Sequence, residues 1–328
     1  MSTRKIVVTF GSGIVEKALL MMKEVAQVVV TRDDSEVALL AEARDADAIL
    51  VGPMPGVTRS LIESAGRLRH IARVGVGVDS VDIEAATERG IIVTNAPEVT
   101  ADSVAEFTVS LLLSLAKNIP RCDRAVKEGR WDERVELMGI NIELRGKTHG
   151  IVGLGKIGRR VAIMCKGFGM RVLYFKRNRD LEFEQSAGVG YAPFQALLKE
   201  CDSISLHLPL TKETANLFNS PQFKSMKKTA LLINQARGKV VNEEALVQAL
   251  KEGAIGGYAS DVYESEPPDP KSELLSFKNV VVSPHLAGGT RESRQRVSMA
   301  VAGDVLKVLQ GHEPENLVNR AVLQRKPF

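Results

Sequence analysis

This chain of 328 residues has few aromatic residues and few cysteines, and its positive and negative charges nearly balance. Phe, Trp and Tyr make up 5% of it, and the formal net charge at pH 7 is +4. A nucleic-acid-binding protein would carry a basic stripe interleaved with aromatics, so this class is disfavoured. No apolar run approaches the roughly 20 residues that cross a bilayer, and the N-terminus, MSTRKIVVTF, lacks the apolar core of a signal peptide.

The three cysteines are odd in number, widely spaced and without a CxxC pair: Cys122, Cys165 and Cys201. They predict no disulfide framework, and we expect reduced thiols in a cytoplasmic protein. No metal site is predicted. The hydrophobic fraction of 44% and the charged fraction of 26% are typical of a soluble globular protein, and the length indicates two domains.

Apolar, strand-like runs alternate with helix-like segments along the chain. Nearly continuous apolar strands that alternate with helices form parallel sheets covered on both faces, so we expect an α/β protein with two doubly wound parallel-sheet units. The strands expected in the first unit cover residues 5–10, 27–30, 48–51, 70–74 and 91–94. Those expected in the second cover residues 148–152, 171–175, 203–207, 230–234, 257–261 and 280–283.

Three segments decide how the two units are connected. Residues 101–116, ADSVAEFTVSLLLSLA, predict a long apolar helix, either an ordinary core helix or one that also packs against a second subunit. The polar segment 121–145 contains the single tryptophan and is interpreted as an arm. A last helix, 290–309, returns the chain to the first unit. We therefore expect one domain at 101–287, inserted in a domain made of 1–100 and 288–328.

A glycine-rich turn, GIVGLGKIG, follows the first expected strand of the inserted domain. Gly153, Gly155 and Gly158 have the G-x-G-x-x-G spacing, which is specific here because a strand precedes it and a helix follows. The first glycine allows the tight turn, the second lets a pyrophosphate approach the backbone, and the third permits close helix–strand packing. Lys156 and Ile157 begin the helix, whose N-terminus offers free N–H groups to the phosphates. The turn predicts a bound dinucleotide.

The next strand ends in a cluster of positive charge. VLYFKRNRD places Lys176, Arg177 and Arg179 directly after the expected strand end. An Asp or Glu at this place usually binds the ribose hydroxyls of NAD, and it would repel the 2′-phosphate of NADP. Three cations in place of that acid predict NADP, with NAD possible. Which cation contacts the 2′-phosphate stays open, and a solvated basic turn is the alternative interpretation.

Three polar residues lie at the ends of later strands, where open α/β sheets bind their ligands. Arg237 can hold a carboxylate with two hydrogen bonds. Glu266 lies in the loop DVYESEPP, and His285 follows the last strand, where an imidazole can exchange a proton near neutral pH. Each alone is more often a surface or structural residue, but together, after a dinucleotide turn, they predict a catalytic set. His207, at another strand end, is either structural or lines the cofactor site.

In these motifs the chain resembles the D-isomer-specific 2-hydroxyacid dehydrogenases, the family of glyoxylate/hydroxypyruvate reductases and 3-phosphoglycerate dehydrogenases. The resemblance covers nearly the whole chain and includes RVGVGVDSVDIEAATERGIIVTN, SVAEFTV, GKTHGIVGLGKIG, CDSISLHLPLTKET, NQARGKVVNEEAL, DVYESEPP and PHLAGGT. It implies that 101–287 is a Rossmann-type dinucleotide-binding domain and that 1–100 with 288–328 is a flavodoxin-like substrate domain. It also implies a homodimer formed through the segments 101–116 and 121–145.

The resemblance assigns roles to single residues. Arg237 would bind the substrate carboxylate and orient the keto oxygen, His285 would be the acid/base, and Glu266 its partner. The residues expected to line the nicotinamide and the cofactor face are Leu208, Ala236 and Asp261. Those whose backbone would contact the substrate carboxylate are Val76 and Gly77. Lys176 departs from the family pattern, because members that prefer NAD carry an acid there.

We therefore expect an NADPH-preferring reductase that converts a small 2-keto acid to the D-2-hydroxy acid. Glyoxylate, hydroxypyruvate and a sugar-derived 2-keto acid all fit, and Arg73 keeps a phosphorylated substrate open. One alternative is an NAD-dependent 3-phosphoglycerate dehydrogenase, although an end at Phe328 after one return helix argues against the long, effector-regulated members. An alternative of another class is a nucleotide-sensing, corepressor-like interaction protein, which would bind nucleotide without turnover. No nucleic-acid or membrane partner is expected.

Overall fold

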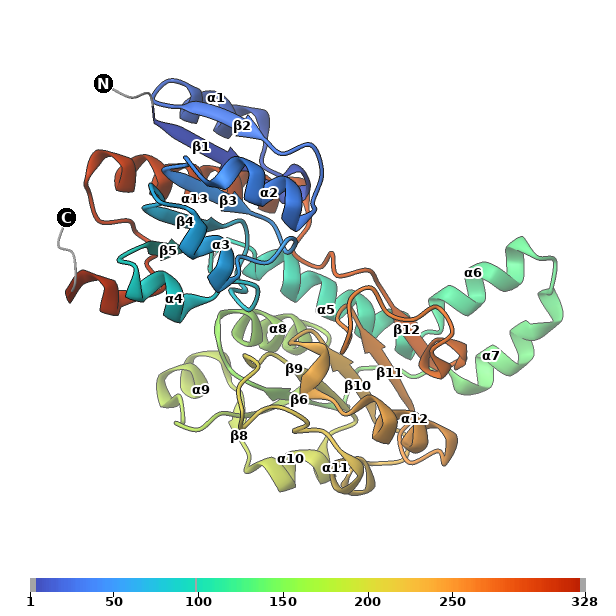
Figure 1. The fold of residues 1–328 in the computed structure, drawn as a ribbon. Helices are drawn as coiled ribbons and strands as arrows, with labels where there is room; N and C mark the ends of the chain where they lie inside the picture. Colours follow the sequence, from blue (N-terminus) through green and yellow to red (C-terminus); the bar gives the residue numbers. More distant parts are fainter. Residues whose placement is uncertain (1–3, 98, 325–328) are drawn as a thin grey trace. The chain divides into compact units, whose positions relative to one another are not determined.

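The structure is a computed structural model that describes residues 4–97 and 99–324. It divides the chain into two compact units, of which the first comprises Met1–Thr100 with Gly288–Phe328 and the second Ala101–Ala287 (Figure 1). Each unit contains one fully parallel sheet with helices on both faces. The α/β class with two parallel-sheet domains, predicted from the alternating pattern, is confirmed.

The first unit has the strand order β2-β1-β3-β4-β5, which is the flavodoxin-like order 2-1-3-4-5. Its strands are β1 (Lys5–Val8), β2 (Gln27–Val30), β3 (Ala48–Val51), β4 (His70–Arg73) and β5 (Ile92–Thr94). One face packs against α2 (Glu36–Ala43), α3 (Arg59–Ser64) and α4 (Ile83–Glu88). The other face packs against α1 (Glu16–Lys23) and α13 (Arg291–Gln310), so the last long helix completes the core that the first hundred residues begin.

The second unit has the strand order β12-β11-β10-β9-β6-β7-β8. Counted from β6, this is the 3-2-1-4-5-6 order of a Rossmann sheet with one added strand. The strands are β6 (Thr148–Val152), β7 (Arg171–Phe175), β8 (Gly190–Tyr191), β9 (Ser203–Leu206), β10 (Leu231–Asn234), β11 (Gly257–Ser260) and β12 (Val280–Val282). One face packs against α5 (Ala101–Ala116), α8 (Lys156–Gly167) and α9 (Leu181–Ala187). The other packs against α10 (Phe194–Glu200), α11 (Ser220–Ser225) and α12 (Glu243–Lys251).

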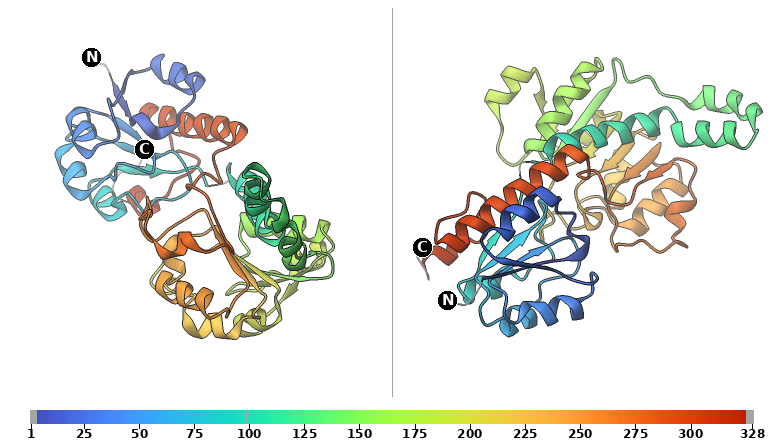
Figure 2. Two further views of the ribbon diagram at one scale, coloured as in Figure 1. Left: turned by 90° about the vertical axis from the view of Figure 1, so that its right-hand side faces the viewer. Right: turned by 90° about the horizontal axis from the view of Figure 1, so that it is seen from above.

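The predicted strands differ from the observed ones mainly at their ends. The first strand stops at Val8, because Phe10–Ser12 forms a 3-10 turn that ends at Gly13 in a left-handed conformation. The short edge strand β8 was not predicted, since its two residues form no apolar run. The segment 121–145, interpreted as an arm, is mostly helical: it contains most of α6 (Ile119–Lys127), the 3-10 turn Trp131–Glu133 and α7 (Arg134–Ile140). Figures 1 and 2 show α6 and α7 projecting from the body of their own unit.

Helix α5 has the burial pattern of a core helix. Its exposed side chains are the polar residues Asp102, Glu106 and Ser110, which recur every four positions and form one narrow stripe. The rest of its surface packs on α8, β10, β11 and β12. Among the described residues, no helix is both long and apolar enough to cross a membrane, and no cluster of His, Cys, Asp or Glu could hold a metal ion.

Candidate active site

The glycine turn joins β6 to α8 and keeps side chains out of the space above the helix N-terminus. Gly153 has φ +100°, and a Cβ atom there would lie 2.5 Å from the backbone oxygen of His207. A Cβ atom at Gly158 would lie 2.4 Å from the backbone oxygen of Gly153, so strand and helix need glycine to approach this closely. At Gly155, the N-cap of α8, a Cβ atom would meet nothing within 4 Å. This open space beside free N–H groups fits the pyrophosphate of a dinucleotide.

The three cations at the end of β7, Lys176, Arg177 and Arg179, differ in the side chains that they contact. Arg179 donates two hydrogen bonds to the carboxylate of Glu184, at 3.1 and 2.6 Å, and its guanidinium lies 5.2 Å from the ring centre of Tyr191. Lys176 lies 3.7 Å from Asp180, which also pairs with Arg159.

Arg177 is the third member of that cluster. It makes no hydrogen bond or ion pair within the described part of the chain. The pKa of Glu213 is lowered mainly by a hydrogen bond from Thr211, and the positive charge of Arg177 adds to this effect. Of the three cations, Arg177 is therefore the one that pairs with no carboxylate in the described part of the chain.

Asn234, the last residue of β10, shapes the loop that carries Arg237. Its buried side chain accepts a hydrogen bond from the backbone N–H of Ala236 at 3.0 Å and donates one to the backbone oxygen of Arg237 at 3.0 Å. The Arg237 guanidinium in turn donates to the oxygen of Ala236 at 2.7 Å. The turn after the strand is thus fixed from inside the sheet, and it presents an arginine at the carboxyl end of β10.

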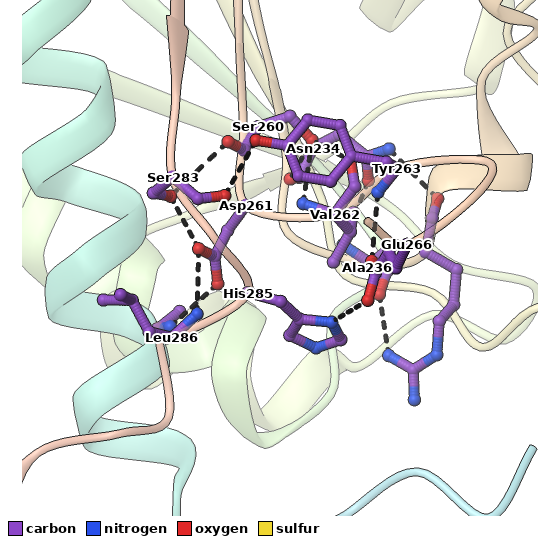
Figure 3. Close-up of polar contacts among 12 residues, drawn as sticks. Asn234, Ala236, Ser260, Asp261, Val262, Tyr263, Glu266, Ser283, His285 and Leu286 are labelled. Atoms are coloured by element: carbon purple, nitrogen blue, oxygen red, sulfur yellow. Dashed lines mark hydrogen bonds and ion pairs between the residues drawn. The ribbon is translucent and has the colours of Figure 1, made fainter. Parts of the chain in front are cut away.

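Asp261, which directly follows β11, performs the same task for the loop that carries His285 (Figure 3). The residue is only 1% exposed, and its carboxylate accepts hydrogen bonds from the Ser283 hydroxyl at 2.6 Å, Leu286 N–H at 3.0 Å and Ala287 N–H at 2.8 Å. His285 itself has φ +50°, a left-handed conformation that is uncommon for residues other than glycine. The hydrogen bonds to Asp261 hold the backbone around this residue on both sides.

His285 and Glu266 form a hydrogen-bonded pair on the accessible side of this loop. The Nδ1 atom of His285 lies 2.6 Å from Oε2 of Glu266, and the two side chains are 47% and 38% exposed. The other carboxylate oxygen accepts the backbone N–H of Tyr263 at 3.1 Å, and the Tyr263 hydroxyl donates to the backbone oxygen of Ser283 at 2.9 Å. Tyr263 therefore ties the loop of Glu266 to the loop of His285.

Gly238 brings the arginine loop against the same assembly. A Cβ atom at Gly238 would lie 1.8 Å from the backbone carbon of Tyr263, so the loop after β10 contacts the loop after β11 with backbone on backbone. Arg237, Glu266 and His285 consequently lie in the loops that follow three neighbouring strands, and these loops contact one another. An imidazole paired with a carboxylate can exchange a proton near neutral pH, and an arginine in a contacting loop can bind a small carboxylic acid.

Residues 109–287, which contain all of these loops, match the family model described as D-isomer specific 2-hydroxyacid dehydrogenase, NAD binding domain. The chain belongs to this family.

Relatives and solved structures agree with this assignment along most of the chain. A glyoxylate reductase from Aeropyrum pernix is 45% identical over 294 residues, which is 88% of each chain. A D-3-phosphoglycerate dehydrogenase from Archaeoglobus fulgidus is 42% identical over 94% of this chain but only 58% of its own length. The crystal structure of an NADPH-dependent glyoxylate/hydroxypyruvate reductase from Sinorhizobium meliloti, in complex with NADP and malonate, has a TM-score of 0.84 with 30% identity and 98% coverage of both chains.

As a 2-hydroxyacid dehydrogenase, the protein is an oxidoreductase that uses a nicotinamide coenzyme and acts on small 2-keto or 2-hydroxy acids. The structure lets us locate the other residues predicted for its site. Leu208 borders the glycine turn, because a Cβ atom at Gly153 would come within 2.9 Å of its side chain. Ala236 is buried in the arginine loop, and Val76 and Gly77 follow β4 in the first unit, where the Val76 oxygen accepts a hydrogen bond from Asn95 at 2.7 Å.

Sequence reasoning did not identify three residues that build this 2-hydroxyacid dehydrogenase site. Asn234 is polar at the end of an apolar strand, LLIN, and that position is a usable signal for a residue that shapes the following turn. Gly238 follows the predicted arginine, and a glycine beside a functional residue indicates close backbone approach. Tyr263 has no such signal, because its role depends on two loops that meet only in the folded unit.

Proposed function

We propose that the protein is an NADPH-preferring reductase that converts a small 2-keto acid, such as glyoxylate or hydroxypyruvate, to the D-2-hydroxy acid. The observation that carries this proposal is the His285–Glu266 pair, at 2.6 Å, beside the loop of Arg237. In this proposal, Ala101–Ala287 is the coenzyme domain, and Met1–Thr100 with Gly288–Phe328 is the substrate domain.

Each side chain of the set has a distinct task. Arg237 neutralises the carboxylate of the 2-keto acid and polarises its carbonyl. His285, as imidazolium, donates its Nε2 proton to the carbonyl oxygen, while Glu266 at Nδ1 stabilises the positive charge of the ring. The bound coenzyme supplies the hydride. Asp261 fixes the loop of His285, and Tyr263 links that loop to Glu266, so the imidazole and the carboxylate stay within hydrogen-bonding distance.

The proposed coenzyme preference rests on the cations at the end of β7. A 2′-phosphate carries between one and two negative charges at neutral pH and attracts guanidinium groups. Arg177 is our first choice for the contact, because Arg179 is engaged by Glu184 and Lys176 lies close to Asp180. Two similar proteins, an acyclic imino acid reductase and the Sinorhizobium meliloti reductase, form complexes with NADPH and NADP respectively.

The substrate is proposed to carry no phosphate. Arg73, the cation that kept phosphorylated substrates open, is half-buried and donates a hydrogen bond to the backbone oxygen of Val74, beside its own strand. Two relatives named D-3-phosphoglycerate dehydrogenase keep that activity as the second candidate. If the protein has this second activity, it should oxidise 3-phosphoglycerate with NAD faster than it converts any unphosphorylated acid.

A homodimer is part of the proposal. The projecting segment of α6, the Trp131 turn and α7 exposes large apolar side chains, among them Trp131 at 67%, Val135 at 65% and Met138 at 63%. Such a cluster on a projecting element is typical of an interface rather than of free surface. Sedimentation at micromolar concentration is expected to give a dimer, and Trp131→Glu a larger monomer fraction. A monomeric parent protein would refute this part.

A turnover screen tests the proposed function. Purified protein is mixed with NADPH and, separately, with glyoxylate, hydroxypyruvate, phosphohydroxypyruvate and a sugar-derived 2-keto acid, and loss of NADPH absorbance is followed. Reduction of at least one unphosphorylated acid is expected. Coenzyme binding without turnover of any acid would support the nucleotide-sensing alternative, and a clear preference for the phosphorylated acid would support the second candidate.

A further inference from the structure

The turn between β7 and α9, residues 176–180, places two arginines close together in different surroundings. Arg177 and Arg179 are both exposed, and only one residue separates them, so their Cα atoms are at most about 7 Å apart. Two long side chains at this spacing can contact the same phosphate group. Of the two, Arg177 pairs with no carboxylate among the described residues, whereas Arg179 pairs with Glu184.

Glu184, in α9, holds the guanidinium of Arg179 at two points. One carboxylate oxygen, Oε1, accepts a hydrogen bond from Nε of Arg179 at 3.1 Å, and the other, Oε2, accepts one from Nη2 at 2.6 Å. Paired contacts of this kind between a planar guanidinium and a carboxylate are stronger than single hydrogen bonds. The guanidinium also lies 5.2 Å from the ring centre of Tyr191, which restrains it further.

The carboxylate of Glu184 is fixed in turn by a buried side chain of the sheet. Tyr174, in β7, is fully buried, and its hydroxyl donates to Oε1 of Glu184 at 2.6 Å and accepts the backbone N–H of Asp180 at 2.8 Å. The Glu184 side chain is only 13% exposed. Hydrogen bonds from Arg179, and then from Tyr174, lower the pKa of Glu184, so this carboxylate is charged at neutral pH.

A phosphate that binds at this turn competes with Glu184 for Arg179. The guanidinium can turn fully toward the phosphate only if it gives up its contacts with the carboxylate. The negative charge of Glu184 also opposes a second negative group beside the same arginine. Since the buried hydroxyl of Tyr174 holds Glu184, the carboxylate does not move aside with Arg179.

We propose that Glu184 is a specificity-determining residue that withholds Arg179 from the coenzyme and so keeps the preference for NADP(H) over NAD(H) below the value that the cations of this turn could give. The inference rests on the proposed function, in which the 2′-phosphate binds at this turn and Arg177 is its main contact. It assigns to an acidic residue of α9 the task of limiting a preference that the neighbouring arginines create.

Glu184→Gln tests this role, because it removes the charge and retains the shape of the side chain. The amide oxygen can still accept the hydrogen bond from Tyr174, so we expect the turn to keep its fold. Asp180 is less suitable for replacement, although it lies 3.7 Å from Lys176, because its carboxylate also caps α9 by accepting the N–H of Phe183 at 3.3 Å.

The probes are adenosine 2′,5′-bisphosphate and 5′-AMP, which differ only in the 2′-phosphate. Calorimetry on the full chain gives the Kd of each, and the ratio of the Kd for 5′-AMP to the Kd for the bisphosphate measures what the 2′-phosphate contributes. In Glu184→Gln this ratio is expected to rise about 3- to 10-fold above that of the parent protein, the equivalent of one additional hydrogen bond. A ratio equal to or below that of the parent would overturn the proposal.

Glu182→Gln is the matched control. Glu182 also lies in the first turn of α9, is exposed, and makes no hydrogen bond or ion pair with the residues that the structure describes. Its replacement removes the same charge from the same helix, and the Kd ratio is expected to rise by less than about 2-fold, because an exposed charge without a partner is screened by solvent and salt. An equal rise in both variants would mean that net charge, and not the contact with Arg179, is responsible, which would also overturn the proposal.

The double variant Glu184→Gln with Arg179→Ala shows whether the gain comes from the released arginine. The Kd ratio is expected to return to about the value of the parent protein, and a gain that persists without Arg179 would contradict the proposal. A parent ratio near one would contradict the proposed NADPH preference instead. Because the inference concerns only the change between parent and variants, the two failures are distinguishable.

Discussion

The Nδ1 atom of His285 lies 2.6 Å from Oε2 of Glu266, and the other oxygen of that carboxylate is held by the backbone N–H of Tyr263 at 3.1 Å (Figure 3). The carboxylate therefore occupies one side of the imidazole, and the proton that the proposed reaction exchanges is the one on Nε2.

Replacement of His285 by Ala removes the proposed proton donor. We expect kcat for keto-acid reduction to fall by about 10²–10⁴, the usual contribution of general acid–base catalysis, with little change in coenzyme Kd. The exposed His312, after α13, provides the control variant His312→Ala, which should keep parental kinetics. Near-normal kcat in His285→Ala would exclude this residue from the mechanism.

Glu266→Gln retains the shape of the side chain and removes its charge. The neutral amide no longer stabilises the imidazolium, so reduction should lose its activity at a lower pH than in the parent enzyme. We expect a displaced pH profile of kcat/KM rather than complete loss of activity. A profile identical to that of the parent would contradict the pairing of Glu266 with His285.

Arg237→Lys preserves the charge but not the planar two-point contact. KM for the keto acid is expected to rise and kcat to fall, because the contact both binds and orients the substrate. Arg171→Lys, at the exposed start of β7, is the control for loss of a guanidinium in the same unit. If Arg237→Lys behaves like the parent enzyme, the bidentate role is wrong.

The buried histidines couple stability to pH. Burial lowers the pKa of His70 from 6.5 to about 3 and that of His149 from 6.5 to about 4, so between these values the unfolded chain binds more protons than the folded one. Their contribution to the free energy of unfolding is thus complete above pH 6.5 and is lost as the pH falls, by at most about 1.4 kcal/mol per pH unit for each histidine.

Urea unfolding at about pH 7.5 and about pH 5 measures this dependence. We expect the parent protein to lose stability at the lower pH and His70→Leu and His149→Leu each to lose less. Equal pH dependence in the parent and both variants would show that these side chains do not titrate as their burial requires.

The buried strands and the residues of the proposed catalytic set were predictable from sequence because each has a local signal. A continuous apolar run such as LLIN marks a buried strand, and the known edge of a parallel sheet then places the residues that follow it. Thus Arg237, Glu266 and His285 were expected to be neighbours, and the structure brings their loops into contact.

What the sequence could not reveal depends on contacts between distant segments. The positive φ of His285 and the three hydrogen bonds to Asp261 depend on loops that approach only after the sheet has formed. Likewise, VLYFKRNRD shows three similar cations, and only the position of Glu184 separates Arg179 from Arg177. His149 looked ordinary because its partners lie more than 50 residues away.

The different contacts of Arg177 and Arg179 predict that their removal changes the coenzyme preference by unequal amounts. Arg177→Ala should reduce the preference for NADPH more than Arg179→Ala, because Arg179 already binds Glu184. Two effective contacts would contribute about 2–4 kcal/mol, and Lys176→Asp combined with Arg177→Ala should turn the preference toward NADH. The ratio of kcat/KM for the two coenzymes measures this, and equal ratios in the two single variants would contradict the choice of Arg177.

An NADPH-preferring reductase activity is tested most directly by kcat/KM of the parent enzyme for glyoxylate reduction, and in parallel for hydroxypyruvate, with NADPH and with NADH. We predict that kcat/KM with NADPH exceeds kcat/KM with NADH by roughly 30- to 1,000-fold, and that this margin shrinks as the salt concentration rises. No reduction of either acid, or equal or better use of NADH, would contradict it.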